Sequence, residues 1–362
     1  YNKFWLRNDA AATTTITKFT IKEVTGDQPR LNYDINANGV VQSCPSLLLE
    51  GASTNLVTYS EDFSNAAWTK SNTTITSNSV ISPDGSLNGV KISASAAFAQ
   101  IQQTYTSIND ADYTLSLFAK LPSSNVVGLR LASGSNDVRR EFNLSTLSIQ
   151  SMGGNNQELI DEGIENYGNG WYRIFLTCKA DGTSAFLNIY PKNSSDATLQ
   201  SVFIFGAQLE QSYPTSYIPT NGASQTRTIE TCNDAGAAST FNSTEGVLYF
   251  ESSALALVGG DSRISLSDGT LNNRISFAYS PTASKGYIIV KINGVSVINN
   301  LNVEIGNHLD TKKIAISYKS GDTKVFLNGV ELSIASSVSF SGGALNDLSF
   351  ESANSSVKFY GN

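Results

Sequence analysis

The sequence predicts an all-β protein made of tandem antiparallel β-sandwich (jelly-roll) domains joined by short linkers. Short runs alternate apolar and polar residues with a period of two, as at 113–120, 127–132 and 171–178. Turn signals such as Ser-Pro-Asp-Gly at 82–85 separate these runs. No stretch has a convincing amphipathic helical pattern, which excludes the α/β enzyme folds.

The composition is typical of a β-rich extracellular or virion protein. Charged residues make up 15% of the 362 positions and hydrophobic residues 40%, whereas roughly a quarter of an average soluble domain is charged. This length predicts two or three cores. The net charge of −7, without a basic stripe, excludes nucleic acid as a partner. No apolar run approaches the roughly 20 residues of a membrane span.

The first half of the chain divides into a partial module, a linker and a complete module. Residues 1–24 repeat the strand spacing of 186–205, which predicts that they are the last strands of a preceding jelly-roll module. Residues 25–46 carry glycines and prolines among polar residues and are interpreted as a linker. The alternating strands of 47–222 form the central module. A polar, alanine-rich passage at 223–243 is interpreted as a second linker.

Residues 244–362 are predicted to form a second sandwich. Asn-Gly pairs at 293–294 and 328–329 join strand-like runs, and Asn-Gly favours the type I′ turn of a two-residue hairpin. Residues 313–319 between them alternate cleanly as a strand. The chain stops within a strand-like run at 359–362, so we expect this sandwich to be C-terminally incomplete and the chain to belong to a longer polypeptide.

Both modules carry family resemblances. The central block opens with the run 46–63 and Trp68, and a Gly-Trp-Tyr-Arg strand start at 170–173 precedes its closing run, 205–227. These segments resemble the carbohydrate-binding-module-like jelly roll that recurs in bacteriophage tail and fibre proteins. The strand at 245–251, the later alternating strand and the final Asn-Gly hairpin resemble a concanavalin-A-like, or laminin-G-like, sandwich.

The resemblance implies a non-catalytic virion surface protein, a tail or head fibre, that binds host or environmental glycans. Its partners would be a polysaccharide or cell-surface glycan and other virion proteins, and its location the outer surface of a phage particle. Fibre proteins are commonly homotrimers, although no heptad repeat indicates one here. Two alternatives stay open: a structural spacer or capsid decoration protein that binds no sugar, and part of a polysaccharide depolymerase whose catalytic domain lies outside this chain.

The sequence predicts no enzyme. His308 is the only histidine and no Gly-x-Ser-x-Gly motif exists, so we interpret His308 as a solvated loop residue. Glu251 lacks a partner carboxylate two or four residues further on, which a glycosidase needs on one strand face. We therefore expect Glu251 to be a structural or surface residue.

A glycan is held by aromatic faces and by planar polar side chains. The aliphatic residues of each strand in the central module should face the core, which leaves aromatic, arginine and amide side chains on the opposite face. We predict that this face binds glycan through Phe118, Arg130, Arg173, Phe175, Asn188 and Tyr190. The alternative is that the two phenylalanines are buried under a loop and the arginines pair with acids.

This interpretation requires no cofactor. The jelly-roll resemblance implies a structural calcium ion near the first and last strands, where Glu50 and Glu210 lie. The three cysteines have neither metal-type nor redox-type spacing. Cys178 alternates with apolar residues and is expected to be a buried free thiol. Cys44 and Cys232 flank the central block and would form a disulfide if its two ends meet.

Overall fold

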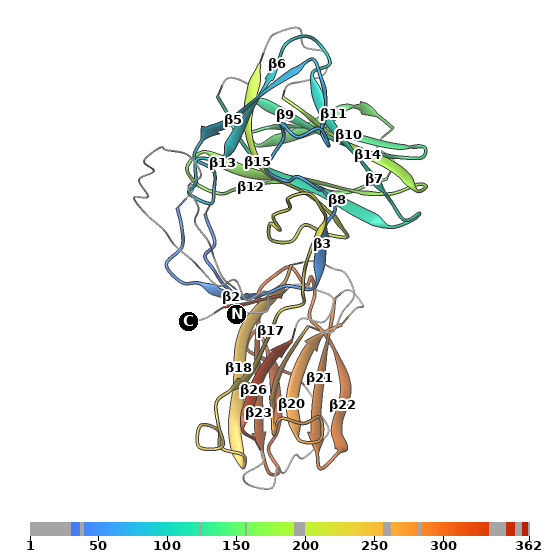
Figure 1. Ribbon diagram of the computed structural model, residues 1–362. Helices are drawn as coiled ribbons and strands as arrows, with labels where there is room; N and C mark the ends of the chain where they lie inside the picture. Colours follow the sequence, from blue (N-terminus) through green and yellow to red (C-terminus); the bar gives the residue numbers. More distant parts are fainter. Residues whose placement is uncertain are drawn as a thin grey trace, which may run out of the picture.

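The computed structural model describes most of the chain as two β-sandwiches. The described residues are 30–36, 40–122, 125–155, 158–191, 200–255, 262–280, 284–332, 345–351 and 357–360. All the regular secondary structure assigned within these residues is β-strand. Figure 1 shows the strands gathered into an upper and a lower body. The all-β fold class is therefore confirmed. The module predicted at 1–24 lies outside the described residues.

The first sandwich consists of two six-stranded antiparallel sheets. The sheet named here the β9/β14 sheet has the order β11 (Ser148–Gly154), β10 (Asn136–Asn143), β9 (Val126–Ser133), β14 (Ser184–Tyr190), β7 (Gln100–Thr106) and β4 (Thr69–Ser71). The β8/β13 sheet has the order β12 (Leu159–Asn166), β13 (Trp171–Lys179), β8 (Asp112–Lys120), β15 (Ser201–Gln211), β6 (Gly89–Ala94) and β5 (Thr73–Val80). The chain crosses between the sheets from β6 to β7, β8 and β9 in turn, which gives a jelly-roll-like architecture.

The core of the first sandwich follows from the predicted alternation. Leu115 and Leu117 of β8 pack between the sheets with Leu129 and Leu131 of β9, all fully buried. Trp68 lies in the same core, and its indole Nε1–H donates to the Tyr59 carbonyl at 2.9 Å. Trp68 is therefore a packing residue of the first core.

The second sandwich is also built of two antiparallel sheets. One has the order β1 (Arg30–Asn32), β2 (Ser46–Leu49), β27 (Val357–Tyr360), β18 (Glu245–Ala254), β23 (Lys312–Lys319), β24 (Lys324–Leu327) and β25 (Val330–Leu332). The other, named the β19/β20 sheet, has the order β17 (Thr231–Ala235), β26 (Asp347–Glu351), β19 (Arg263–Ser267), β20 (Arg274–Tyr279), β21 (Lys285–Ile292) and β22 (Val295–Glu304). Both predicted Asn-Gly turns are present, with positive φ at Asn293, Gly294, Asn328 and Gly329.

Three domain boundaries differ from the prediction. The run 46–49, expected to open the central module, forms β2 and pairs with β27, and Leu49 is buried in the second core. The expected linkers at 25–46 and 223–243 contain β1 and β17, which are also strands of the second sandwich. An apolar run predicts a strand but does not specify its partner, which is why these strands were misassigned.

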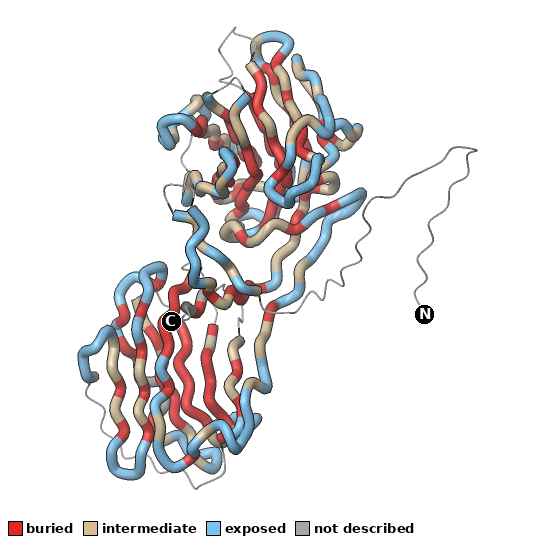
Figure 2. The backbone as a smooth tube through the Cα atoms, turned by 90° about the vertical axis from the view of Figure 1, so that its left-hand side faces the viewer, coloured by how far each residue is buried: buried red, intermediate tan, exposed pale blue. Residues whose placement is uncertain are grey.

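The two bodies are joined at a narrow junction. A small sheet of β3 (Ser53–Asn55) and β16 (Gln225–Arg227) lies there, so the chain enters and leaves the first sandwich at one place. Figure 2 shows buried backbone concentrated in the strands of each body and exposed backbone at their ends. Each sandwich has its own hydrophobic core cluster.

Candidate functional site

The structure divides the six predicted glycan-binding residues between two opposite faces of the first sandwich. Arg130, Asn188 and Tyr190 lie on the outer side of the β9/β14 sheet, and Phe118, Arg173 and Phe175 lie on the outer side of the β8/β13 sheet. The prediction of one common face was therefore wrong. Alternation shows which side chains point away from the core, but it does not show to which sheet a strand belongs.

On the β9/β14 sheet the predicted side chains contact one another and their neighbours. The guanidinium of Arg130 pairs with Asp137 at 2.8 Å and lies 4.5 Å from the ring centre of Phe186. Asn188 and Tyr190 are both buried. This face therefore does not present an open aromatic groove.

On the β8/β13 sheet Phe118 lies beneath the segment 212–218. It belongs to a small buried cluster with Trp171 and Phe205, and Tyr217 packs against this cluster edge-on. A bulge at Gly206, where φ is +63°, interrupts β15 and makes room for the Tyr217 ring. The expected alternative for Phe118, burial under a loop, is what the structure shows.

Arg173 fixes the same segment and is 6% exposed. Its guanidinium donates to the Ser116 hydroxyl at 3.1 Å and to the Thr215 carbonyl. It therefore supports the polar floor beneath residues 212–216 and does not project into solvent.

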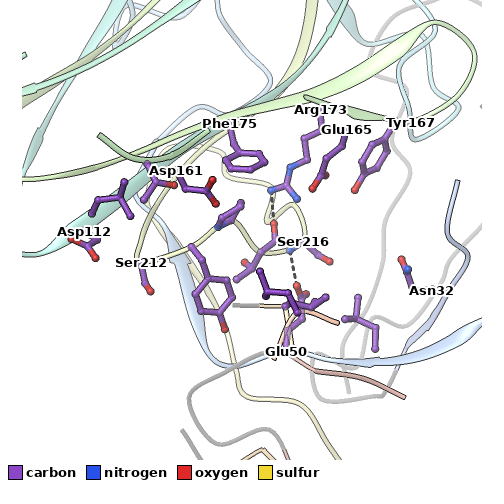
Figure 3. Close-up of a pocket in the computed structure, with 18 residues that line it drawn as sticks. Asn32, Glu50, Asp112, Asp161, Glu165, Tyr167, Arg173, Phe175, Ser212 and Ser216 are labelled. Atoms are coloured by element: carbon purple, nitrogen blue, oxygen red, sulfur yellow. Dashed lines mark hydrogen bonds between the residues drawn. The ribbon is translucent and has the colours of Figure 1, made fainter. Parts of the chain in front are cut away.

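Phe175 is only partly buried, because it lines a cavity of about 530 Å³ between the β8/β13 sheet and the second sandwich. Figure 3 shows Arg173, Phe175, Glu165 and Tyr167 on the sheet side of this cavity, with Glu50 across from them. We call it the inter-module cavity. Its polar and aromatic lining includes Asp112, Asp161, Glu165, Tyr167, Arg173, Phe175 and Tyr213. Leu255 and Leu309 of the second sandwich also contribute.

The inter-module cavity is acidic. In the described part of the chain, Asp112, Asp161 and Glu165 form no ion pair. One oxygen of Asp112, Oδ1, is buried and has no hydrogen-bond partner there. Arg173 supplies one positive charge against these three carboxylates. The cavity therefore offers hydrogen-bond acceptors beside aromatic rings.

Sequence reasoning missed most of this lining. On β12 the side chains of Asp161 and Glu162 point to opposite faces, and Glu162 pairs with Arg140. Asp161 alone nevertheless reaches the cavity. Tyr167 and Tyr213 follow β12 and β15, and aromatic residues just after a strand are the signal that could have indicated them.

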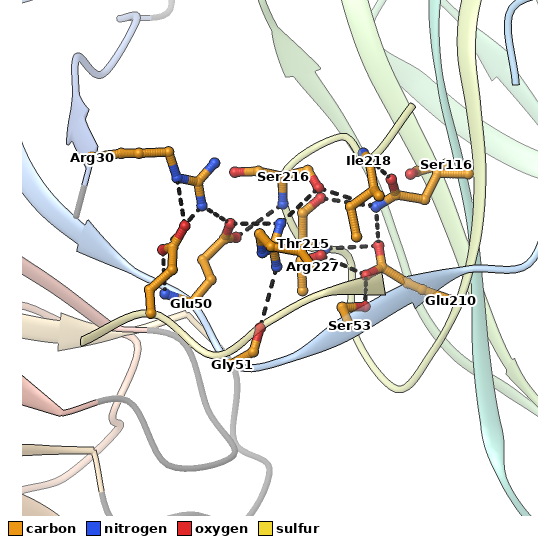
Figure 4. A network of polar contacts seen from close by, with 12 residues as sticks. Arg30, Glu50, Gly51, Ser53, Ser116, Glu210, Thr215, Ser216, Ile218 and Arg227 are labelled. Atoms are coloured by element: carbon orange, nitrogen blue, oxygen red, sulfur yellow. Dashed lines mark hydrogen bonds and ion pairs between the residues drawn. The ribbon is translucent and has the colours of Figure 1, made fainter. Parts of the chain in front are cut away.

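A buried ionic network holds the junction together, as Figure 4 shows. Glu50 is 2% exposed and pairs with Arg30 and with Arg227, the latter at 3.1 Å. Its Oε1 accepts the Ser216 N–H at 2.9 Å, which connects it to the wall of the inter-module cavity. Arg30 also pairs with Glu230 at 2.8 Å. Burial alone would raise the pKa of Glu50, but the guanidiniums of Arg227 and Arg30 hold it below the ordinary value.

Acid should weaken this junction. Because the pKa of folded Glu50 is depressed, its stabilising contribution is present above the ordinary value of 4.5 and is lost as the pH falls through the folded pKa. We expect the melting temperature to fall with pH below that value, and to fall less steeply in Glu50→Gln. Thermal unfolding across acidic pH measures both slopes, and equal slopes in the two proteins would contradict the assignment.

The expected calcium site does not fit the two glutamates. Glu50 is held by two arginines, and a cation there would meet their positive charge. Glu210 is fully buried and accepts bonds from Ser53 Oγ at 2.6 Å and from both the N–H and the hydroxyl of Thr215. Calcium requires six to eight oxygen ligands with free lone pairs. Within the described residues, no group of three or more acidic, histidine or cysteine side chains is placed to hold a metal.

The cysteine predictions have different outcomes. Cys178 is a buried free thiol, as expected, and burial raises its pKa to about 12. Cys44 and Cys232 are also free, so the expected disulfide is not present. The two ends of the block do meet, at β3 and β16, but Cys44 precedes β2 in one sheet of the second sandwich and Cys232 lies on β17 in the other.

Glu251 and His308 both contact neighbouring side chains of the second sandwich. Glu251 accepts the Tyr249 hydroxyl at 2.6 Å and lies 3.4 Å from Lys313, as expected for a structural residue. The interpretation of His308 as solvated was wrong, because it is 2% exposed and its ring packs on Tyr279 at 5.3 Å. Burial lowers the pKa of His308 and favours its neutral form. The loop-like sequence around His308 gave no sign that its side chain is buried.

Comparisons with known proteins leave the family unassigned. No protein-family model matches the chain, and no curated protein matches its sequence. Within the described ranges, no helix has the length and apolar character needed to cross a membrane. The cavity chemistry and the resemblance in sequence are therefore what indicates a function.

Proposed function

We propose that this chain is part of a non-catalytic virion surface protein, a tail or head fibre, whose β-sandwich modules bind host or environmental glycans. The observation that carries the binding proposal is the inter-module cavity, where a partly exposed Phe175 lies among carboxylates. The virion context is supported by the motifs at 46–63 and 205–227 that resemble phage fibre modules.

The cavity has the size and chemistry of a saccharide site. Its volume of about 530 Å³ lies within the range of about 300–1,000 Å³ usual for small-ligand sites. The rings of Phe175, Tyr167 and Tyr213 offer faces on which a sugar can stack. Asp112 and Asp161 offer acceptors for its hydroxyl groups. Because the lining carries excess negative charge, we expect neutral or amino sugars to be preferred over acidic ones.

The carboxylates of β12 are placed for binding better than for hydrolysis. Asp161 and Glu165 are four residues apart on one strand, which separates their Cα atoms by about 13 Å. The two carboxyl groups of a glycosidase lie about 5–9.5 Å apart. Release of reducing ends from a capsular polysaccharide by this chain alone would favour the depolymerase alternative.

Phe175→Ala is expected to weaken glycan binding about tenfold, because aromatic stacking contributes up to about 1.5 kcal/mol beyond buried area. The measurement is glycan-array binding followed by calorimetric titration of the best ligand. Phe98→Ala is the matched control, since Phe98 is 66% exposed and does not line the cavity. Wild-type affinity in Phe175→Ala would reject the cavity as the site.

A structural spacer is the second candidate, and the junction network favours it. Glu50, Arg30, Arg227 and Glu230 tie strands of the second sandwich to the segment below the first. A rigid link of this kind suits a fibre that transmits orientation between modules. Failure of the wild-type chain to bind any bacterial surface glycan would favour the spacer over the adhesin.

A further inference from the structure

A second cavity lies on the outer face of the β19/β20 sheet. Its volume is about 310 Å³ and its lining combines two arginines with several hydroxyls: Arg263, Arg274, Ser265, Ser267, Thr270 and Ser349. All of these residues belong to the second sandwich, away from the inter-module cavity. We call it the arginine–serine cavity.

The strand register explains the arrangement. Ser265 of β19 lies directly opposite Ser276 of β20 and Ser349 of β26, so three serines form a row across three strands. Directly opposed residues in antiparallel strands share a face. In the next row toward one end of the cavity, Ser267 lies between Arg274 and Asp347.

Hydrogen-bonding capacity remains open in the serine row. Ser276 is 1% exposed, yet no group in the described chain hydrogen-bonds its hydroxyl. A buried hydroxyl without a partner costs about 1–3 kcal/mol. Ser276 does not itself line the cavity, but its cross-strand partner Ser265 does, so a polar ligand or water in the cavity would meet Ser265.

The acid in this cavity is already satisfied by the wall. Asp347 Oδ1 accepts the Asp234 N–H at 2.7 Å. Its Oδ2 accepts the hydroxyls of Ser267, at 3.3 Å, and of Ser349. These hydroxyl hydrogens are directed to Asp347, so Ser349 presents acceptor lone pairs to a ligand. The side chain of Asp234 lies at the exposed rim.

The arginines define the charge that the cavity can accept. Each guanidinium carries five N–H donors, so an arginine can keep contacts within the protein and still donate to a ligand. Arg274 is 7% exposed, and a guanidinium held at low exposure binds carboxylate more strongly than one in open solvent. Arg263 and Arg274 stand on either side of the serine row.

We propose that the arginine–serine cavity binds an acidic monosaccharide unit. The sugar carboxylate would be held by Arg263 and Arg274, and the sugar hydroxyls by Ser265 and Ser349. This site is distinct from the inter-module cavity, and its lining holds two arginines beside Asp234 and Asp347.

Calorimetric titration of the full chain with glucuronate, glucose and inorganic sulfate tests this proposal. We expect glucuronate to bind, sulfate to bind more weakly, and any binding of glucose to be unaffected by Arg263→Gln, because a neutral sugar would occupy the inter-module cavity. Sulfate binding as tight as glucuronate would mean a free-anion site and would overturn the sugar-acid assignment. Glucose binding that Arg263→Gln weakens, or no glucuronate binding, would also overturn it.

Substitutions of residues that line the arginine–serine cavity test whether glucuronate binds there. Arg263→Gln should weaken glucuronate binding about tenfold or more, as expected for loss of a charged hydrogen bond. Ser265→Ala removes a lining hydroxyl without altering charge and should also weaken it. Lys324→Gln removes a cation from the opposite sheet and should leave the affinity unchanged. Unchanged affinity in both Arg263→Gln and Ser265→Ala, with native melting curves, would refute the site.

Phe175→Ala separates the two cavities. It should leave glucuronate affinity intact while weakening the glycan bound in the inter-module cavity. Loss of glucuronate binding in Phe175→Ala would place the acidic ligand in the inter-module cavity and overturn the second site. A wild-type chain that binds glucuronate but no neutral glycan would reject the inter-module cavity as a glycan site and support this inference.

Discussion

Glu50→Ala is expected to lower the free energy of unfolding by about 3–5 kcal/mol, the usual cost of removing one partner from a buried ion pair. The loss leaves Arg227, whose side chain is 11% exposed, without its carboxylate. Arg30 is 38% exposed, so water compensates it in part and most of the cost falls on Arg227. The Ser216 N–H also loses its acceptor.

Urea denaturation and calorimetry measure this effect. Glu245→Ala is the matched control, because Glu245 pairs at 2.8 Å with Lys319 and both side chains are more than half exposed. The control should keep the wild-type melting temperature. A melting temperature for Glu50→Ala equal to that of Glu245→Ala would show that the junction network does not stabilise the fold.

The same variant should affect the inter-module cavity indirectly. The segment 212–216 is held by Arg173 and Glu210 on the side of the first sandwich and by Glu50 on the other. Releasing one side loosens a wall of the cavity, so glycan affinity should fall although Phe175 is unchanged. If Glu50→Ala lowers both the free energy of unfolding and the glycan affinity, Glu50 is a positioning residue for the cavity wall.

Local sequence rules predicted the elements of the fold well. Period-two alternation identified the buried faces of β8, β9 and β13, since each face must meet a core. Asn-Gly identified both hairpin turns, because it tolerates positive φ at both positions. These features depend on residues close together in the sequence.

Long-range partners could not be predicted in the same way. Nothing in the run 46–49 indicates that β2 pairs with β27, about 310 positions later. For the same reason Phe175 and Tyr190 were placed on one face, although their strands lie in different sheets. The burial of His308 and the buried pairing of Glu50 also depend on partners distant in sequence.

Trp68→Ala should destabilise only the first sandwich, by about 3–5 kcal/mol. Trp68 is 1% exposed, packs on Phe63 with ring centres 5.2 Å apart, and donates to the Tyr59 carbonyl. Its removal leaves both a cavity and an unsatisfied carbonyl. Trp68→Phe fills most of the space and loses only the hydrogen bond, so its cost should be smaller.

The two separate cores make this prediction specific to one module. Trp68 belongs to the first core cluster, whereas the second cluster is built from residues such as Leu49, Phe277 and Ile316. In calorimetry, the transition of the first sandwich should move to lower temperature while that of the second stays near its wild-type position. An equal shift of both would mean that the junction couples the sandwiches into one cooperative unit, in which case Glu50→Ala should uncouple them.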